Sequence, residues 1–190
     1  MRVRGERSDA RRSRTALLRA GAELMAERGK DVPMYEVARR AGVGQATLYR
    51  HFPDRSTLAA AIFEEVLDDL ERVAAADPDD PRAFDVLLAA VVDAQVRMHG
   101  LVGVLRGGDR GLPHMVHLRD RALRLFAAPV RAGRAAGTLR ADLEPTDMVI
   151  LMTMVEGVLQ GVPGPQRRAT AARRALELIR AAVAGPAAAR

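Results

Sequence analysis

The chain has no cysteine among its 190 residues. That absence excludes disulfide frameworks, thiol redox sensing, zinc fingers and cysteine nucleophiles. Lysine is almost missing as well, because Lys30 is the only lysine among 30 basic residues and the others are all arginine. Arginine forms paired hydrogen bonds with phosphate and guanine, which suits a nucleic-acid partner. A GC-rich coding bias would produce the same preference.

Long apolar runs are also absent. The longest, residues 148–155, is interrupted by Thr153 and is far too short to span a bilayer. The basic N-terminal segment is not followed by an apolar run of signal-peptide length. We therefore expect a cytoplasmic protein that does not contact a membrane. Strand-like alternation and internal repeats are missing too, and the periodicity of the apolar residues predicts an all-α fold.

The charge of the chain is unevenly distributed. Residues 1–56 contain 13 basic and 7 acidic residues, whereas the remainder contains 17 of each. The whole formal net charge of +6 therefore belongs to the N-terminal segment. A basic head on a neutral body is typical of proteins that bind a polyanion.

Residues 34–52 predict a helix, a tight turn and a second helix. Apolar residues at i, i+3, i+4 and i+7 mark the first helix: Met34, Val37, Ala38 and Ala41. Gly42 ends it, because glycine adopts the left-handed conformation at a helix C-terminus without steric cost. In the second helix Leu48 and Phe52 share one edge, and Arg50 points away from it. A short helix anchored on one side suits the DNA major groove.

Three stretches resemble the DNA-binding domain of the TetR family of transcriptional regulators. They are Leu-Met-Ala-Glu-Arg-Gly at 24–29, Ala-Gly-Val at 41–43 and Thr-Leu-Tyr-Arg-His-Phe-Pro at 47–53. The segment 137–143, Gly-Thr-Leu-Arg-Ala-Asp-Leu, is similar to the loop before the dimer helices in many members. The resemblance implies a three-helix head in residues 1–60 and a larger helical domain in residues 61–190 that binds an effector and dimerises.

Two positions depart from the family pattern. Gly44 stands where the family usually has serine, so the second helix of the turn lacks a side-chain cap. Pro33 stands where a Ser or Thr cap is usual, but proline is tolerated in the first turn of a helix.

We expect Arg50 to read a guanine edge, with Gln45 and Thr47 adding contacts and Ala46 leaving room for close approach. Contact of Arg50 with phosphate alone is the alternative. The resemblance implies phosphate contacts for Tyr49, His51 and Arg55. The arginine-rich arm before residue 15 either contacts DNA or is a solubilising tail.

Helix-capping and helix-breaking residues predict where the remaining helices begin and end. Ser8 or Asp9 can cap the first helix and Gly29 can stop it, while Asp54 can cap the helix after the reading pair. The body is then expected to contain helices at 54–76, 82–99, 113–136, 145–161 and 166–184, with a short helix at 101–106. The glycine-rich segment 100–111 lacks the ending of a phosphate loop and is interpreted as a connector.

Gln95 lies at the centre of an apolar helix face, where an unpaired amide is costly. We expect it to help line a pocket for a largely apolar small molecule, formed by Gln95, Met98, Met115, Phe126, Met152 and Glu156. Ordinary core filling by the methionines, and pairing of Gln95 with a neighbouring helix, are the alternatives. Thr153, Glu156 and Gln160 form a polar stripe that a partly exposed helix edge would also explain.

The last two helices carry more apolar residues than one chain can cover. They predict a twofold homodimer interface formed by Ile150, Met154, Gly157, Val158, Leu176 and Ile179. His114 and His117 lie one turn apart but lack a third ligand, and no residues form a catalytic arrangement, so we expect no enzyme, cofactor or metal. A metal site based on this histidine pair is the alternative. The interpretation is a repressor that a small molecule releases from a palindromic operator in double-stranded DNA. An effector-independent architectural dimer is the alternative.

Overall fold

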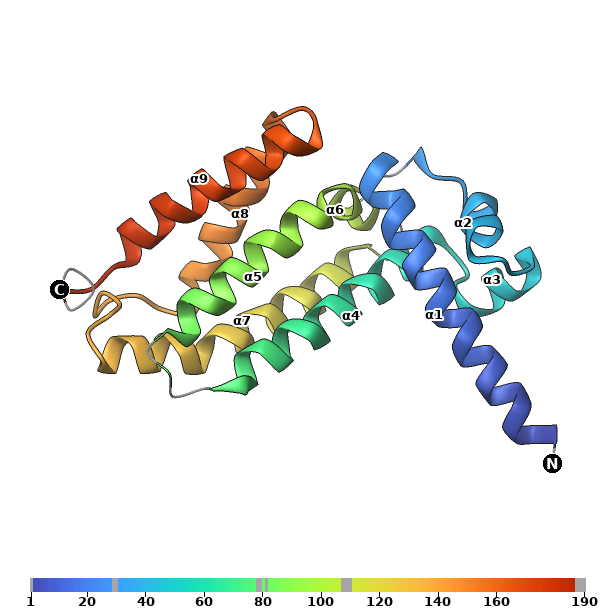
Figure 1. Cartoon of the computed structure of the whole chain (residues 1–190), viewed down its shortest axis with the longest axis horizontal. Coiled ribbons are helices and arrows are strands. Elements are labelled where there is room, and N and C mark those ends of the chain that lie inside the picture. The colour runs from blue at the N-terminus through green and yellow to red at the C-terminus, as the bar shows by residue number, and fades with distance from the viewer. Residues whose placement is uncertain (1, 29–30, 78–79, 81, 107–110, 187–190) are drawn as a thin grey trace. The chain divides into compact units, whose positions relative to one another are not determined.

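A computed structural model describes residues 2–28, 31–77, 80, 82–106 and 111–186, and within its helices it describes the side chains of all but residues 2–8, 106 and 111–115. Over these residues the chain forms helices and no strand, which confirms the all-α prediction (Figure 1). The helices are α1 (Arg2–Arg28), α2 (Met34–Ala41), α3 (Gln45–His51), α4 (Arg55–Ala76), α5 (Ala83–Arg97), α6 (His99–Arg106), α7 (Gly111–Ala135), α8 (Asp147–Gly161) and α9 (Pro165–Val183).

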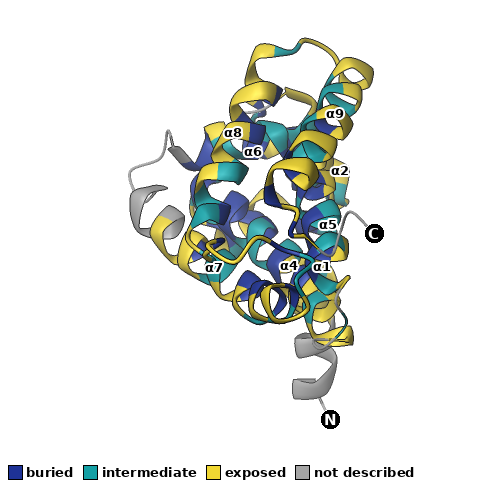
Figure 2. Cartoon of the chain, turned by 90° about the vertical axis from the view of Figure 1, so that its left-hand side faces the viewer, coloured by how far each residue is buried: buried dark blue, intermediate teal, exposed yellow. Residues whose placement is uncertain are grey.

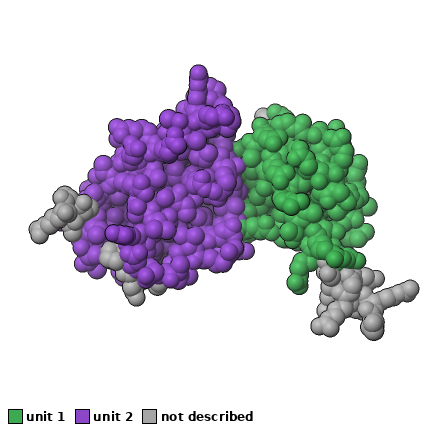
Figure 3. All heavy atoms as spheres, in the orientation of Figure 1, with its two compact units in different colours: residues 1–65, 100–116 green, residues 66–99, 117–190 purple. Residues whose placement is uncertain are grey.

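The helices are divided between two compact units (Figure 3). Residues 1–65 and 100–116 form the first unit, called the head below, and residues 66–99 and 117–190 form the second, called the body. The head therefore includes α6 without its first residue, His99, and the first residues of α7 in addition to the N-terminal segment. Both α4 and α7 contribute residues to each unit.

Helix α1 differs from its prediction at the N-terminal end. It begins at Arg2 rather than after a cap at Ser8 or Asp9, and Asp9 forms an ion pair with Arg12 on the next turn instead. Arginine has a high helix propensity, so the basic arm continues the helix. The predicted stop at Gly29 lies outside the described residues.

Helix α1 packs against α2 and approaches α4 closely at Gly21. Leu17, Leu24 and Met25 of α1 are buried, as their spacing predicts. Gly21 lies between them, and a Cβ atom there would be only 3.1 Å from side-chain atoms of Leu58 and Ile62 on α4. The absence of a side chain at residue 21 therefore lets the two helices approach each other.

The N-terminus of α4 is capped by Asp54, as predicted. Its Oδ1 accepts hydrogen bonds from the backbone N–H of Thr57 at 2.7 Å and from the hydroxyl of Ser56 at 2.8 Å. The same oxygen accepts a bond from the Thr57 hydroxyl at 2.8 Å. This carboxylate satisfies a helix donor that has no partner within the helix.

Replacing this cap should weaken the head. We expect Asp54→Ala to lower the free energy of unfolding by about 0.5–2 kcal/mol, the usual cost of losing an N-cap. Urea denaturation followed by circular dichroism measures the difference. Asp31→Ala removes an exposed carboxylate from the same unit and is the matched control. Equal stability of the two variants would contradict the role assigned to Asp54.

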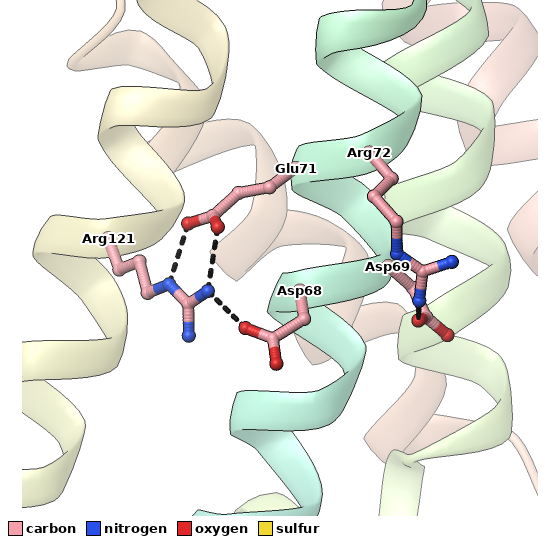
Figure 4. A network of polar contacts seen from close by, with 5 residues as sticks. All are labelled: Asp68, Asp69, Glu71, Arg72 and Arg121. Carbon is pink, nitrogen blue, oxygen red and sulfur yellow. Dashed lines mark hydrogen bonds and ion pairs between the residues drawn. The ribbon is translucent and has the colours of Figure 1, made fainter.

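The core of the body is built from α5, α7, α8 and α9. Helices α5, α8 and α9 pack against one another, and Phe84 of α5 contacts Phe126 of α7 with ring centroids 5.9 Å apart. Helix α7 continues through Pro129 to Ala135. On its other side the Arg121 guanidinium lies between Glu71 and Asp68 of α4, donating to Glu71 at 2.6 and 2.8 Å (Figure 4).

The segment between α7 and α8 is tied to the end of α9. The Arg140 N–H donates to the Val183 carbonyl at 3.0 Å, and the Gly185 N–H donates to the Thr138 carbonyl at 2.8 Å. A Cβ atom at residue 185 would lie 2.4 Å from the Gly137 carbonyl oxygen. Only glycine fits there without a shift of the backbone.

Within the described ranges, no single helix has both the length and the apolar character needed to cross a membrane. Helix α5 and residues 99–105 pass that criterion only when taken together, and they are bent by 72°.

Candidate functional site

The turn between α2 and α3 is closed by Gly42. Its φ of 69° is the left-handed conformation expected at a helix C-terminus. Two backbone bonds complete this cap: the Gly42 N–H donates to the Arg39 carbonyl at 3.2 Å, and the Val43 N–H donates to the Ala38 carbonyl at 3.0 Å. The chain therefore reverses within Gly42–Gly44 and starts α3 at Gln45.

Helix α3 begins without a side-chain cap, as the glycine at position 44 predicts. Gly44 is extended, with φ −70° and ψ 149°, and its carbonyl accepts bonds from the N–H groups of Thr47 and Leu48 at 3.0 and 3.1 Å. Pro33 occupies the same extended position before α2. Both helices of the motif therefore start by backbone geometry alone.

One edge of α3 is anchored in the head and the opposite edge is exposed. Leu48 has no exposed surface and Phe52 only 2%, which confirms the helical phase expected from the sequence. Four of the predicted DNA-binding residues are exposed: Gln45, Ala46, Tyr49 and Arg50. The other three, Thr47, His51 and Arg55, are half-buried beside them.

Several arginines of the head are engaged in holding it together. Arg14 lies over the Phe52 ring at 5.6 Å and 3.8 Å from Glu65, whereas Arg40 pairs with Glu23 at 3.2 Å. Arg28 pairs with Glu36, and this hydrogen bond lowers the pKa of the Glu36 carboxyl. Arg50, by contrast, has no hydrogen bond or ion pair with any residue that the structure describes.

In the body, the Gln95 amide is half satisfied by a neighbouring helix. Its Nε2 donates to the Met152 carbonyl of α8 at 2.9 Å. Its Oε1 is buried and has no hydrogen-bond partner among the described residues. The alternative of pairing within the core therefore accounts for one end of the amide and leaves the other open.

Glu156 lies one turn beyond Met152 and is buried, with 7% of its surface exposed. Its Oε1 accepts a hydrogen bond from Gln160 at 2.7 Å, while Oε2 has no partner in the described part of the chain. The polar stripe expected on α8 therefore differs in solvent exposure along its length, because Thr153 and Gln160 are exposed and Glu156 is buried.

His99 joins this group from the start of α6, with Nδ1 3.9 Å from Glu156 Oε1. Burial lowers the pKa of His99, and the positive charge of Arg168 lowers it further, while Glu156 opposes the shift. His99 was not predicted to belong to this group. Its position four residues after Gln95 was the available signal, because residues four apart lie on the same side of a helix.

The structure does not place all of the other predicted effector residues, Phe126, Met98 and Met115, beside Gln95. Phe126 packs on Phe84, which is 11 residues and so roughly 16 Å along α5 from Gln95. Met98 is buried, and the Met115 side chain lies outside the described residues. A surface hollow of 360 Å³ lies elsewhere, between α4 and α7 beside Glu71, Ala75 and Arg124.

The predicted dimer residues of α8 form an exposed apolar stripe. Ile150, Met154 and Val158 are 60%, 59% and 40% exposed at i, i+4 and i+8, and Gly157 is exposed beside them. Figure 2 shows the exposed and buried positions along the helices, α8 among them. On α9 the predicted interface residues lie on a side of the helix that packs at least partly against its own chain. Ile179 is 6% exposed and belongs to the core of its own chain, Leu176 is half-buried, and Leu178 is the exposed leucine.

No three His, Cys, Asp or Glu side chains gather as metal ligands among those that are described. His117 is exposed on α7, and the side chain of His114 lies outside the described residues.

These features define a class: an all-helical protein with an N-terminal helix-turn-helix whose second helix presents a polar face, followed by a larger helical body. Residues 17–62 match the family described as "Bacterial regulatory proteins, tetR family". The helix-turn-helix segment of this chain is thus that of the TetR family of regulatory proteins.

Curated relatives support this assignment. An uncharacterized HTH-type transcriptional regulator of Mycobacterium tuberculosis is 37% identical over 78 residues, which are 40% of this chain and 41% of the relative. The match thus spans about two fifths of that relative's length. The HTH-type transcriptional repressor KstR2 of Rhodococcus jostii is 25% identical over 142 residues, 69% of this chain and 70% of that protein.

Solved structures extend the similarity to nearly the whole chain. A TetR transcription regulatory protein from Mycobacterium vanbaalenii is 27% identical with a TM-score of 0.68, covering 94% of this chain and 98% of that one. A TetR transcriptional regulator from Streptomyces coelicolor is 28% identical with a TM-score of 0.68, covering 91% and 99%.

Proposed function

We propose that the chain is a transcriptional regulator that binds a palindromic operator as a homodimer and is released by a small molecule. The observation that carries the proposal is the exposed face of α3, on a helix anchored by Leu48 and Phe52. Arg50 on that face has no partner among the described residues, so its guanidinium is available for a base edge or a phosphate.

A homodimer is supported by the apolar stripe on α8. Three large apolar side chains on consecutive turns are exposed in the single chain, and soluble monomers rarely leave such a patch uncovered. Gly157 beside the stripe permits close approach of a second helix. A twofold axis there would present two copies of α3 to successive major grooves, about 34–36 Å apart.

Release by a small molecule is supported by the polar group in the body, where Gln95 and Glu156 keep buried oxygens without partners in the described chain. Repression is the sense favoured by similarity, because KstR2 is named a repressor. A ligand that weakens operator binding 100-fold must prefer the released form by about 2.7 kcal/mol.

The direct test of DNA recognition is footprinting. Purified protein is incubated with DNA from upstream of its own gene and of the neighbouring genes, at several salt concentrations. We expect protection of a site with twofold symmetry and an affinity that falls with salt. Protection without sequence preference would favour the architectural alternative.

Gln95 provides a test of release that leaves the head unchanged. We expect Gln95→Leu to keep operator affinity within about twofold, because the substitution lies in α5 and leaves the exposed residues of α3 unchanged. Induction of a reporter driven by the footprinted promoter should be blunted, since the bond from Gln95 to the Met152 carbonyl is lost. Gln166→Leu, at an exposed glutamine of α9, is the control. Normal induction of the Gln95 variant would remove this residue from the mechanism.

A further inference from the structure

Three buried polar atoms without partners in the described chain lie close together in the body. They are Gln95 Oε1, His99 Nδ1 and Glu156 Oε2, and they are called the polar cluster below. Gln95 bonds to Met152 of α8, Glu156 is one turn further along α8, and His99 is one turn beyond Gln95 and 3.9 Å from Glu156. The cluster thus lies within the body, where the C-terminal end of α5 and His99 lie against the middle of α8.

Such a cluster is not ordinary core packing, because nearly all buried polar groups in proteins have a hydrogen-bond partner. Two polar side chains associated with the cluster form hydrogen bonds elsewhere through one group each. Gln160 donates to the other oxygen of Glu156 at 2.7 Å, and Arg168 donates its Nε–H to the Val162 carbonyl at 3.0 Å. The cluster is also close to the surface, since 14% of the His99 side chain and 10% of the Glu156 side chain are exposed.

The chemistry of the cluster is that of an acceptor. The Met152 carbonyl can only accept, so it fixes the Gln95 amide with its nitrogen bonded and its oxygen open. Glu156 adds a carboxylate oxygen, which accepts most strongly from a charged donor. Burial and Arg168 lower the pKa of His99, so at neutral pH its ring adds no positive charge to the cluster.

We propose that the polar cluster binds the protonated amine of a small organic molecule, with Glu156 Oε2 and Gln95 Oε1 accepting its N–H donors. This inference rests on the proposed effector role of the body and names the chemical class of that effector. It changes the expectation of a largely apolar ligand: an apolar skeleton remains compatible with buried Met98 nearby, but recognition comes from the charged end. A metal ion is less suited, because only His99 and Glu156 supply strong metal ligands.

The test uses matched probes and the full-length protein. Butyl, hexyl, benzyl and phenethyl skeletons are each tested as primary amine, alcohol and carboxylate, with zinc chloride as a separate arm. Isothermal titration calorimetry at pH 7 measures binding. We expect the amines to bind at least about tenfold more tightly than their alcohol analogues, with the carboxylates weakest, as a charge-assisted hydrogen bond requires.

Variants locate the binding. Glu156→Gln keeps the size of the side chain and removes its charge, so the preference for amine over alcohol should disappear. Gln95→Leu, which removes the second acceptor, should weaken the amine without abolishing its advantage. Glu177→Gln, at an exposed glutamate of α9, is the control and should bind amines as the wild type does. Circular dichroism verifies that each variant is folded.

The outcomes separate this inference from the proposed function. Amine binding that needs Glu156 but does not release the footprinted DNA supports the site and contradicts its role as the effector site. Equal binding of amines and alcohols, or an amine preference that survives in Glu156→Gln, overturns the inference even if DNA binding is normal. Zinc binding that requires Glu156, with no amine preference, also overturns it.

Discussion

Val158→Asp should convert the protein to a monomer and lower its operator affinity by about 100-fold or more, because linked binding of two half-sites is lost. Val158 is 40% exposed in the single chain, so the substitution should change monomer stability by less than about 0.5 kcal/mol. In the proposed dimer the same carboxylate would be buried near its symmetry mate without a partner, which is strongly unfavourable. Sedimentation velocity and operator titration measure the two effects.

Val86→Asp is the matched control, since Val86 is an exposed valine on α5, outside the proposed interface. It should remain dimeric and bind the operator normally. If Val158→Asp were dimeric at micromolar concentration with unchanged operator affinity, the interface would have to lie on another face. A dimer lost equally in both variants would indicate general damage to the body.

Arg50→Ala should weaken binding to the cognate operator by about 1–3 kcal/mol and relax the preference at one base position. Arg55→Ala should weaken all sequences alike and reduce the slope of affinity against salt by about one unit, as expected for a phosphate contact. The structure provides the contrast on which this pair depends, with Arg50 exposed on α3 and Arg55 half-buried at the first residue of α4.

The comparison requires operators with single base changes as well as scrambled DNA. Arg19→Ala, at an exposed arginine of α1, controls for the loss of one positive charge from the head. Equal losses for Arg50→Ala and Arg55→Ala across cognate and scrambled DNA would mean that Arg50 contacts only phosphate.

The head was the most predictable part of the fold, because its signals are local. Gly42 ends α2 and Asp54 caps α4 as their residue types indicate, and the spacing of Leu48 and Phe52 identified the buried edge of α3. The predicted start of α1 was wrong because a local signal was interpreted without its neighbours. Ser8 and Asp9 are good caps, but a cap residue does not end a helix when the residues before it also favour one.

The site in the body could be predicted only in part. Gln95 and Glu156 were identified as polar residues on apolar helices. The partner of Gln95 is a backbone carbonyl 57 residues away. Because every residue has a backbone carbonyl, the residue type could not identify this partner. Phe126 was assigned to the same pocket by its apolar character alone, and it contacts the opposite end of α5.

The proposed interface residues of α9 could also be predicted only in part. Leu176, Leu178 and Ile179 are adjacent on α9, and periodicity does not tell which of them faces its own chain. Burial assigns Ile179 to the core and leaves Leu178 exposed. The pairing of Gly185 with Thr138 was also missed, because a single backbone bridge produces no pattern in the residues around it.

The ion pairs of Arg121 with Asp68 and Glu71 affect the order in which these three residues can be substituted during evolution. One guanidinium serves two carboxylates, so either acid can be lost while the other still neutralises the arginine. Loss of Arg121 first would leave two like charges one turn apart on α4, which repel. The order of substitutions therefore matters: one acid can be replaced while the other still pairs with Arg121, but replacing both acids before Arg121 would leave a guanidinium that is only 15% exposed without these two carboxylates, which costs more than the repulsion.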